Sequence, residues 1–138
     1  MKVHAYLNFD GQAEEAFRFY ADVLNGTLTE VHRFGSMPPS DEFQLTPEQQ
    51  NRVMHVGIEL PDGQMLMASD ILEGMGPPHV AGTNFSISVH PPSRAEADRI
   101  FEALGDGGMV TMPLADQFWG DYFGSVVDRF GIGWMVNY

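Results

Sequence analysis

Cysteine is absent from the 138 residues, and its absence excludes several kinds of chemistry. The chain forms no disulfide, holds no zinc through thiolates and has no cysteine nucleophile. Long apolar runs are also missing, since none approaches the roughly 18 residues of a membrane span. The apolar run within residues 1–11 is too short and interrupted for a signal peptide. We therefore expect a cytoplasmic protein with no membrane partner.

Basic residues are scarce as well. Seven Lys and Arg residues stand against 19 Asp and Glu residues, which gives a formal net charge of −12. A protein that binds nucleic acid needs a basic face to meet the phosphates. Nucleic acid is therefore not expected as a partner, and the acidity mainly favours solubility.

The residues that are present form a pattern that occurs twice. Apolar residues at every second position predict a strand over 3–9, and an apolar stripe at helical spacing predicts a helix over 13–24. Three strand-like stretches follow, at 27–34, 52–60 and 64–69. The same order recurs at 84–90, 93–104 (opening with Ser93 and Glu96 at capping-box spacing), 109–116, 118–128 and 128–138.

The internal repeat can be placed in register. Tyr20 corresponds to Phe101 at an offset of 81, and Gly63 corresponds to Gly131 at an offset of 68. The first half therefore carries 13 additional residues, which we assign to the polar stretch 35–50. We predict an α+β fold of two βαβββ modules, 1–70 and 84–138, joined by a Gly- and Pro-containing linker, 71–83, within a single domain 1–138.

Each helix covers one face of its sheet, and we expect the two sheets to join into one curved mixed β-sheet with a central cleft. Because strand side chains alternate between faces, the sequence predicts which residues face each way. The residues expected in the core are Ala5, Leu7, Phe9, Val56, Ile58, Leu66, Ala68, Phe85, Ile87, Val89, Trp134 and Val136. The residues expected in the cleft are His4, Tyr6, Asn8, His55, Gly57, Glu59, Met65, Met67, Ser69, Asn84, Ser86, Ser88, Gly133, Met135 and Asn137.

Four stretches make the chain similar to the PhnB-like branch of the vicinal oxygen chelate (VOC) superfamily, which includes glyoxalase I, extradiol dioxygenases and bleomycin-resistance proteins. They are AYLNFDGQAEEAFRFY (5–20), RVMHVGIEL (52–60), LMASD (66–70) and VTMPLADQFWGDYFGSVVDRFGIGWMVN (110–137). The resemblance implies the glyoxalase/bleomycin resistance-like fold. It also implies a homodimer, and the open edges of such a sheet are consistent with one.

The resemblance also implies where a metal ion would be held. Metal-using relatives place one ligand in the first strand and one in the last strand of each half. The corresponding residues here are His4, Met67, Asn84 and Met135. Two thioethers and an amide do not replace the oxygen and imidazole donors that Mg²⁺, Mn²⁺, Ni²⁺ or Fe²⁺ needs. We therefore expect no metal at the usual site and no cofactor.

Two interpretations of the polar residues remain open. His4, His55 and Glu59 could hold a displaced metal centre for a lyase, isomerase or dioxygenase, or they are ordinary polar residues on a half-solvated sheet. His32, His79 and His90 are expected to be surface residues. Members of this branch are often labelled methyltransferases, but no glycine-rich strand-to-helix loop is present.

The methionines and aromatic residues favour a binding role. Methionines either fill space or form an adaptable apolar wall, and Tyr6, Phe118, Trp119 and Tyr122 could add aromatic surface. We predict that the cleft binds a small apolar or aromatic molecule. A non-catalytic paralogue that acts through protein contacts is a further alternative. The residues expected to bind the ligand are His4, Tyr6, His55, Glu59, Met67, Ser69, Asn84, Trp119, Tyr122, Met135 and Asn137.

Overall fold

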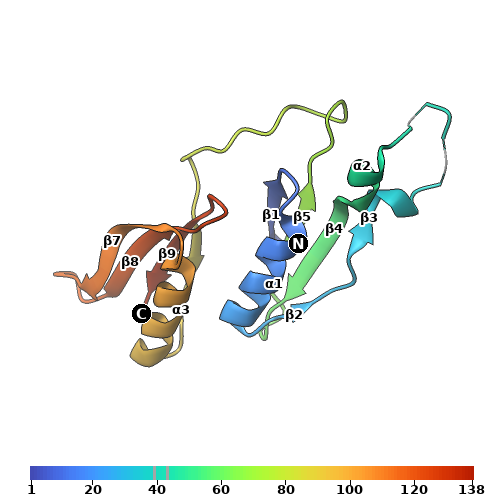
Figure 1. Cartoon of the computed structure of the whole chain (residues 1–138). Helices are drawn as coiled ribbons and strands as arrows, with labels where there is room; N and C mark the ends of the chain where they lie inside the picture. The colour runs from blue at the N-terminus through green and yellow to red at the C-terminus, as the bar shows by residue number, and fades with distance from the viewer. Residues whose placement is uncertain (39, 43) are drawn as a thin grey trace. The chain divides into compact units, whose positions relative to one another are not determined.

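The structure is a computed structural model that describes residues 1–38, 40–42 and 44–138. The chain divides into two compact units, Met1–Val80 and Ala81–Tyr138. Each unit contains one βαβββ module, so the predicted α+β class and the repeated module are confirmed (Figure 1). The proposal that both modules and the 71–83 linker act as a single domain remains a prediction.

The first unit is built on a five-stranded sheet. Its strands are ordered β1-β5-β4-β2, β3 also pairs with β4, and β1 runs parallel to β5. The elements are β1 (Ala5–Phe9), α1 (Ala13–Leu24), β2 (Thr27–Leu28), β3 (His32–Arg33), the 3₁₀ turn η1 (Phe34–Ser36), α2 (Pro47–Asn51), β4 (Val53–Glu59) and β5 (Met65–Asp70).

The second unit repeats this plan with four strands. Their order is β6-β9-β8-β7, and β6 runs parallel to β9 as β1 does to β5. The elements are β6 (Ile87–Val89), α3 (Arg94–Gly105), β7 (Met109–Asp116), β8 (Tyr122–Val127) and β9 (Gly133–Asn137). The turn glycines Gly63 and Gly131 correspond as predicted, with φ angles of 76° and 87° that favour glycine.

In both units the core lies between the helix and one face of the sheet. In the first unit, α1 lies against the sheet (Figure 1). Its apolar stripe, which includes Phe17 and Tyr20, is buried. The buried residues on the helix side of the sheets are Leu7, Phe9, Val56, Ile58, Leu66, Ala68, Val126, Trp134 and Val136. The alternation of apolar and polar residues along the strands therefore determines which face of each sheet the helix covers.

Several predicted boundaries and burials need correction. Ala5, at the first position of β1, is exposed. Phe85 was expected in the core but is 56% exposed, because β6 begins only at Ile87. The stretch 27–34 forms two short strands rather than one, with a register shift at His32–Arg33.

The helix ends also differ in part from the sequence prediction. α3 begins after Ser93, whose hydroxyl accepts from the Glu96 amide at 3.1 Å, but the Glu96 carboxylate bonds to Arg99 instead of completing a capping box. The complete capping box lies inside the polar stretch 35–50, where Thr46 and Gln49 start α2.

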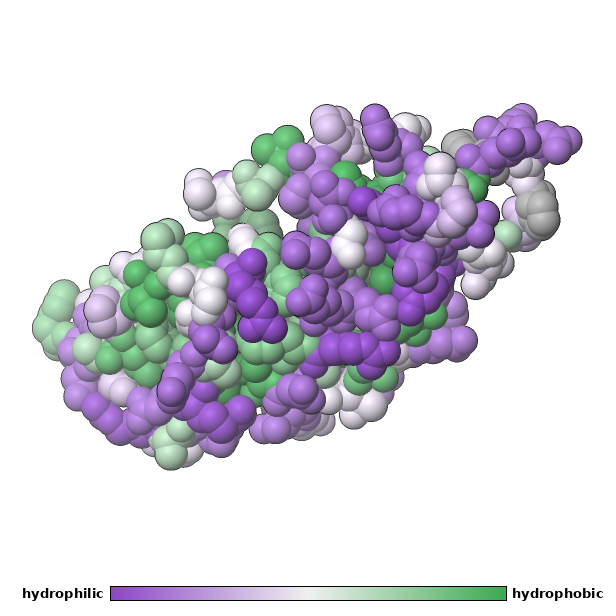
Figure 2. All heavy atoms as spheres, viewed as in Figure 1, coloured by the Kyte–Doolittle hydropathy of each residue, from purple (hydrophilic) through white to green (hydrophobic). Residues whose placement is uncertain are grey.

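Hydrophobic side chains are unevenly exposed. Figure 2 shows hydrophobic residues gathered on the visible face of the second unit, while hydrophilic residues cover most of the visible face of the first. The exposed large hydrophobic residues of the second unit are Phe85, Met109, Val110, Met112, Phe118, Trp119, Met135 and Tyr138. Within the described part of the chain, no helix has the length and apolar composition needed to span a lipid bilayer.

Candidate functional site

The face of the first sheet that points away from α1 carries four of the residues predicted to bind a ligand. We call this surface the first open face and define it by Tyr6, His55, Met65, Met67 and Ser69. On β5, the residues that alternate with Met65, Met67 and Ser69 are buried on the α1 side, so these three side chains point to the other side of the sheet. The face therefore presents aromatic, imidazole, thioether and hydroxyl groups together.

Tyr6 joins the strands of this face. It lies directly opposite Met67 across the parallel β1–β5 pair, and Met67 in turn lies opposite Gly57 on β4. The Tyr6 hydroxyl lies 3.3 Å from Nδ1 of His55, and the two ring centroids are 5.8 Å apart. Three strands thus contribute to one polar and aromatic group.

Gly57 allows this group to be compact. A Cβ at Gly57 would lie 3.3 Å from both the Met65 methyl carbon and the Thr29 hydroxyl oxygen. The Gly57 amide donates to that same hydroxyl at 2.8 Å. The absence of a side chain at Gly57 therefore lets Met65 lie across the strand and extend the apolar surface.

The second sheet has a matching face away from α3, which we call the second open face. Met135 lies opposite Ser125 on β8 and Ser88 on β6, and Asn137 lies opposite Phe123. The Ser125 and Thr111 hydroxyls are 2.7 Å apart. The sequence prediction missed Phe123 and Ser125. Their alternation with Gly124 and the apolar Val126 along the strand is the signal that could have placed them on this face.

Trp119 and Phe118 extend the aromatic surface of the second unit. The Phe118 and Trp119 ring centroids are 5.0 Å apart and those of Trp119 and Phe123 are 6.5 Å apart. The indole N–H of Trp119 donates to Asp121 at 3.0 Å, which holds the ring at the turn before β8. Phe118 is 97% exposed.

Tyr122 lies on the α3 side of the second sheet. Its hydroxyl donates to Asp98 of α3, and the Arg94 guanidinium lies 3.8 Å from its ring centroid. The hydrogen bond to Asp98 raises the pKa of Tyr122. Tyr122 therefore occupies the face opposite to Met135, and its contacts attach α3 to β8.

The three residues of the displaced metal centre do not converge. His4 is half-buried one residue before β1, and the exposed Glu59 ends β4, four residues after His55. Four residues of strand separate two side chains by about 13 Å. In residues 1–38, 40–42 and 44–138, no three His, Asp or Glu side chains are grouped so that they could share a metal ion.

The usual metal positions do not fit an ion either. Met67 lies beside Tyr6 and Met135 lies beside Ser88, so each pair offers a thioether and a hydroxyl rather than imidazole and carboxylate. Asn84 lies three residues before β6 begins. By strand register, Ser86 rather than Asn84 corresponds to His4. A serine in place of the asparagine makes the four residues no better suited to bind a metal ion.

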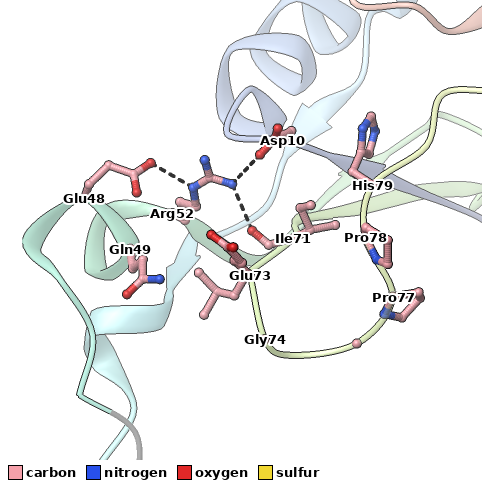
Figure 3. A pocket seen from close by; sticks show the side chains of 12 residues that line it. Asp10, Glu48, Gln49, Arg52, Ile71, Glu73, Gly74, Pro77, Pro78 and His79 are labelled. Carbon is pink, nitrogen blue, oxygen red and sulfur yellow. Dashed lines mark hydrogen bonds and ion pairs between the residues drawn. The ribbon is translucent and has the colours of Figure 1, made fainter.

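A concave pocket of about 530 Å³ lies elsewhere in the first unit (Figure 3). Arg52 donates to Asp10 at 2.8 Å, to Glu48 at 2.9 Å and to the Ile71 carbonyl at 3.0 Å. The hydrogen bond from Arg52 holds the pKa of Asp10 below its ordinary value. The hydrogen bonds of Arg52 therefore connect α2 and the end of β1 to the segment after β5.

Comparisons with known proteins agree with this architecture. Residues 1–137 match the family model described as 3-demethylubiquinone-9 3-methyltransferase. Protein YjdN of Escherichia coli is 26% identical over 143 residues, which cover 99% of this chain and 95% of YjdN.

Two solved structures are similar over the whole chain. Protein PA1353 from Pseudomonas aeruginosa is 39% identical with a TM-score of 0.85, covering 99% of this chain and 96% of PA1353. A putative 3-demethylubiquinone-9 3-methyltransferase, PhnB protein, from Bacillus cereus is 25% identical with a TM-score of 0.76, covering 99% and 98%.

A more distant structure shows the fold. The glyoxylase/bleomycin resistance protein/dioxygenase domain from Frankia has a TM-score of 0.65 at 15% identity, covering 99% of this chain and 95% of that domain. The repeated module therefore has the glyoxalase/bleomycin resistance-like fold that the sequence predicted. The chain belongs to the family described as 3-demethylubiquinone-9 3-methyltransferase, the PhnB-like branch of the vicinal oxygen chelate superfamily.

Proposed function

We propose that this protein binds a small apolar or aromatic molecule on the first open face, without the metal ion of the superfamily's enzymes. The observation that carries the proposal is the group formed by Tyr6, His55 and Met67 on three adjacent strands. Tyr6 is 46% exposed, so its ring is accessible to a ligand.

The chemistry of this group suits such a ligand. Thioethers adapt to an apolar shape and make favourable contacts with aromatic rings, each worth about 0.3–1.5 kcal/mol. The Tyr6 hydroxyl, the His55 ring and the Ser69 hydroxyl offer a few polar partners that can fix the orientation of a bound molecule. The buried residues beneath the strands hold the surface rigid, which lowers the entropic cost of binding.

Methyl transfer, which the family description names, receives no support from the helix starts. A nucleotide-type cofactor commonly binds to a glycine-rich turn and the free amides at a helix N-terminus. Here the turn from β1 to α1 is Asp-Gly-Gln. The amides of Gly11 and Ala13 already donate to the buried Asp70 carboxylate, at 3.0 Å and 2.9 Å.

The proposal is tested with a neutral apolar probe, N-phenyl-1-naphthylamine, titrated into chelator-treated protein while its fluorescence is followed. We expect saturable binding that Tyr6→Ala and Met67→Ala each weaken at least about tenfold, equivalent to about 1.4 kcal/mol. Met75→Ala, which shortens an exposed methionine on a loop, is the matched control and should leave the affinity unchanged.

Two results would contradict the proposal. One is wild-type affinity in both the Tyr6→Ala and Met67→Ala proteins. The other is probe binding that appears only after a divalent metal is added and that His4→Ala or Glu59→Gln abolishes, because that pattern would favour the displaced metal centre.

A further inference from the structure

Two histidines face each other across neighbouring strands of the first unit. His32 on β3 lies directly opposite His55 on β4 in the antiparallel register. Directly opposed residues point to the same side of a sheet, with Cβ atoms about 4.5–5.5 Å apart. The two imidazole rings therefore start from adjacent positions on one surface.

The neighbours of both histidines show which surface this is. Arg33, the next residue after His32, reaches the α1 side, where its guanidinium donates to Glu14 at 2.6 Å. Successive strand residues point to opposite sides, so His32 points away from α1. His55 points the same way, because its ring contacts Tyr6 on the first open face.

The register shift keeps the pair together. His32 and Arg33 are consecutive, yet they lie opposite His55 and Val53, so Met54 is the extra residue of a bulge in β4. Bulges re-aim side chains locally. Here the bulge places Val53 on the buried side with Arg33 and leaves His55 on the open side with His32.

The Tyr6 hydroxyl is placed to set which ring nitrogen of His55 carries the proton. It lies 3.3 Å from Nδ1 of His55, and a donor Nδ1–H in this contact leaves Nε2 without a proton. An outer partner that fixes the tautomer of a ligating histidine is the usual companion of a metal-bound imidazole.

We propose that His32 and His55 form a two-histidine site for Zn²⁺. Imidazole nitrogens bind Zn²⁺ at about 2.0–2.1 Å, and its tetrahedral geometry brings two such nitrogens within the span that opposed strand residues offer. In the described part of the chain no third His, Asp or Glu joins them. Water therefore completes the coordination, and binding is reversible and open to a further ligand.

This site is distinct from the superfamily's four-ligand position, since neither His4 nor Met67 takes part. It does not rest on the proposed function, although His55 also belongs to the first open face. The net charge of −12 favours the approach of a cation.

The test is calorimetric titration of ZnCl₂ into untagged full-length protein at neutral pH. We expect one Zn²⁺ per chain, with affinity at least about tenfold lower in His32→Ala and in His55→Ala. His4→Ala and His90→Ala are the matched controls and should bind Zn²⁺ as the wild type does.

A wild-type Zn²⁺ affinity in His32→Ala would overturn the proposal, and so would loss of binding in His4→Ala. His32 is exposed, so its truncation leaves the core intact, and the circular dichroism of each variant checks the fold. The two proposals fail separately: His32→Ala should keep the affinity for N-phenyl-1-naphthylamine, and Met67→Ala should keep the affinity for Zn²⁺.

Discussion

At the residue scale, two buried carboxylates organise the chain around amide donors. Asp70 and Asp128 are each 3% exposed. Asp70 accepts from the amides of Gly11, Ala13 and Val53, at 2.9–3.0 Å. Asp128 accepts from the amides of Phe130 and Ile132 and from the indole of Trp134. Their bonds make them structural residues rather than catalytic acids or bases.

Replacing Asp128 by Ala should lower the free energy of unfolding by about 3–5 kcal/mol, because it leaves three donors without an acceptor. The urea midpoint measured by tryptophan fluorescence reports the change, since Trp134 packs beside the site. Asp62→Ala, in the exposed turn between β4 and β5, is the control. A midpoint equal to that of the control would show that Asp128 does not hold the last turn.

At the element scale, ion pairs and close backbone packing at glycine determine how the helices and strands pack together. Glu14 of α1 bonds to Arg18 at 2.7 Å and to Arg33 of β3 at 2.6 Å. In the second unit, a Cβ at Gly124 would lie 2.8 Å from the Leu114 backbone and from the Phe101 ring. Each contact sets the position of an element that borders an open face.

Arg33→Met should destabilise the protein by up to about 1 kcal/mol at pH 7, the usual range for a partly exposed ion pair. The hydrogen bonds from Arg18 and Arg33 lower the pKa of Glu14 from its ordinary 4.5. Its contribution is therefore complete above pH 4.5 and is lost as the pH falls through the lowered value. Thermal melts at pH 7 and at successively lower pH should show a difference from wild type that shrinks as the pH falls; a difference of the same size at every pH would contradict the ion pair.

Gly124→Ala should lower stability by about 1–3 kcal/mol, because the added methyl group meets backbone that cannot move aside. The same substitution at Gly82, where a Cβ meets only the Asn84 side chain at 3.5 Å, should be tolerated. Denaturant melts compare the two variants. Equal stabilities would show that β7 and β8 can separate to admit the methyl group.

The parts of this fold that could be predicted from sequence are those with strong periodicity. The two helices with apolar stripes appear where expected, because burial on one side leaves a clear 3.6-residue pattern. α2 has no buried residue, and its signals were the Thr46–Gln49 capping box and Pro47 at the first helical position. Tyr122 was predicted to bind the ligand but lies on the α3 side, because the side to which each residue of β8 points depends on how β8 pairs with its neighbours. His32 and His55 lie opposite each other because of a bulge in β4, which residue spacing alone does not reveal.

At the scale of the whole molecule, we propose a homodimer, which fits the apolar residues left exposed on the second unit. Light scattering on the eluted protein should give a mass near twice the 15.3 kDa of the chain. Met112→Glu, on the exposed edge strand β7, should shift this mass toward that of a monomer. A wild-type mass equal to that of one chain would contradict the dimer.

The central claim, that the first open face binds an apolar molecule without the usual metal, is tested most directly by NMR of methyl-labelled methionine. The chain has nine methionines, which serve as reporters across both units. With a chelator present, adding N-phenyl-1-naphthylamine should shift the methyl signals of Met65 and Met67 and leave that of Met75 in place. Shifts confined to other methionines, or shifts that require added metal, would contradict the account.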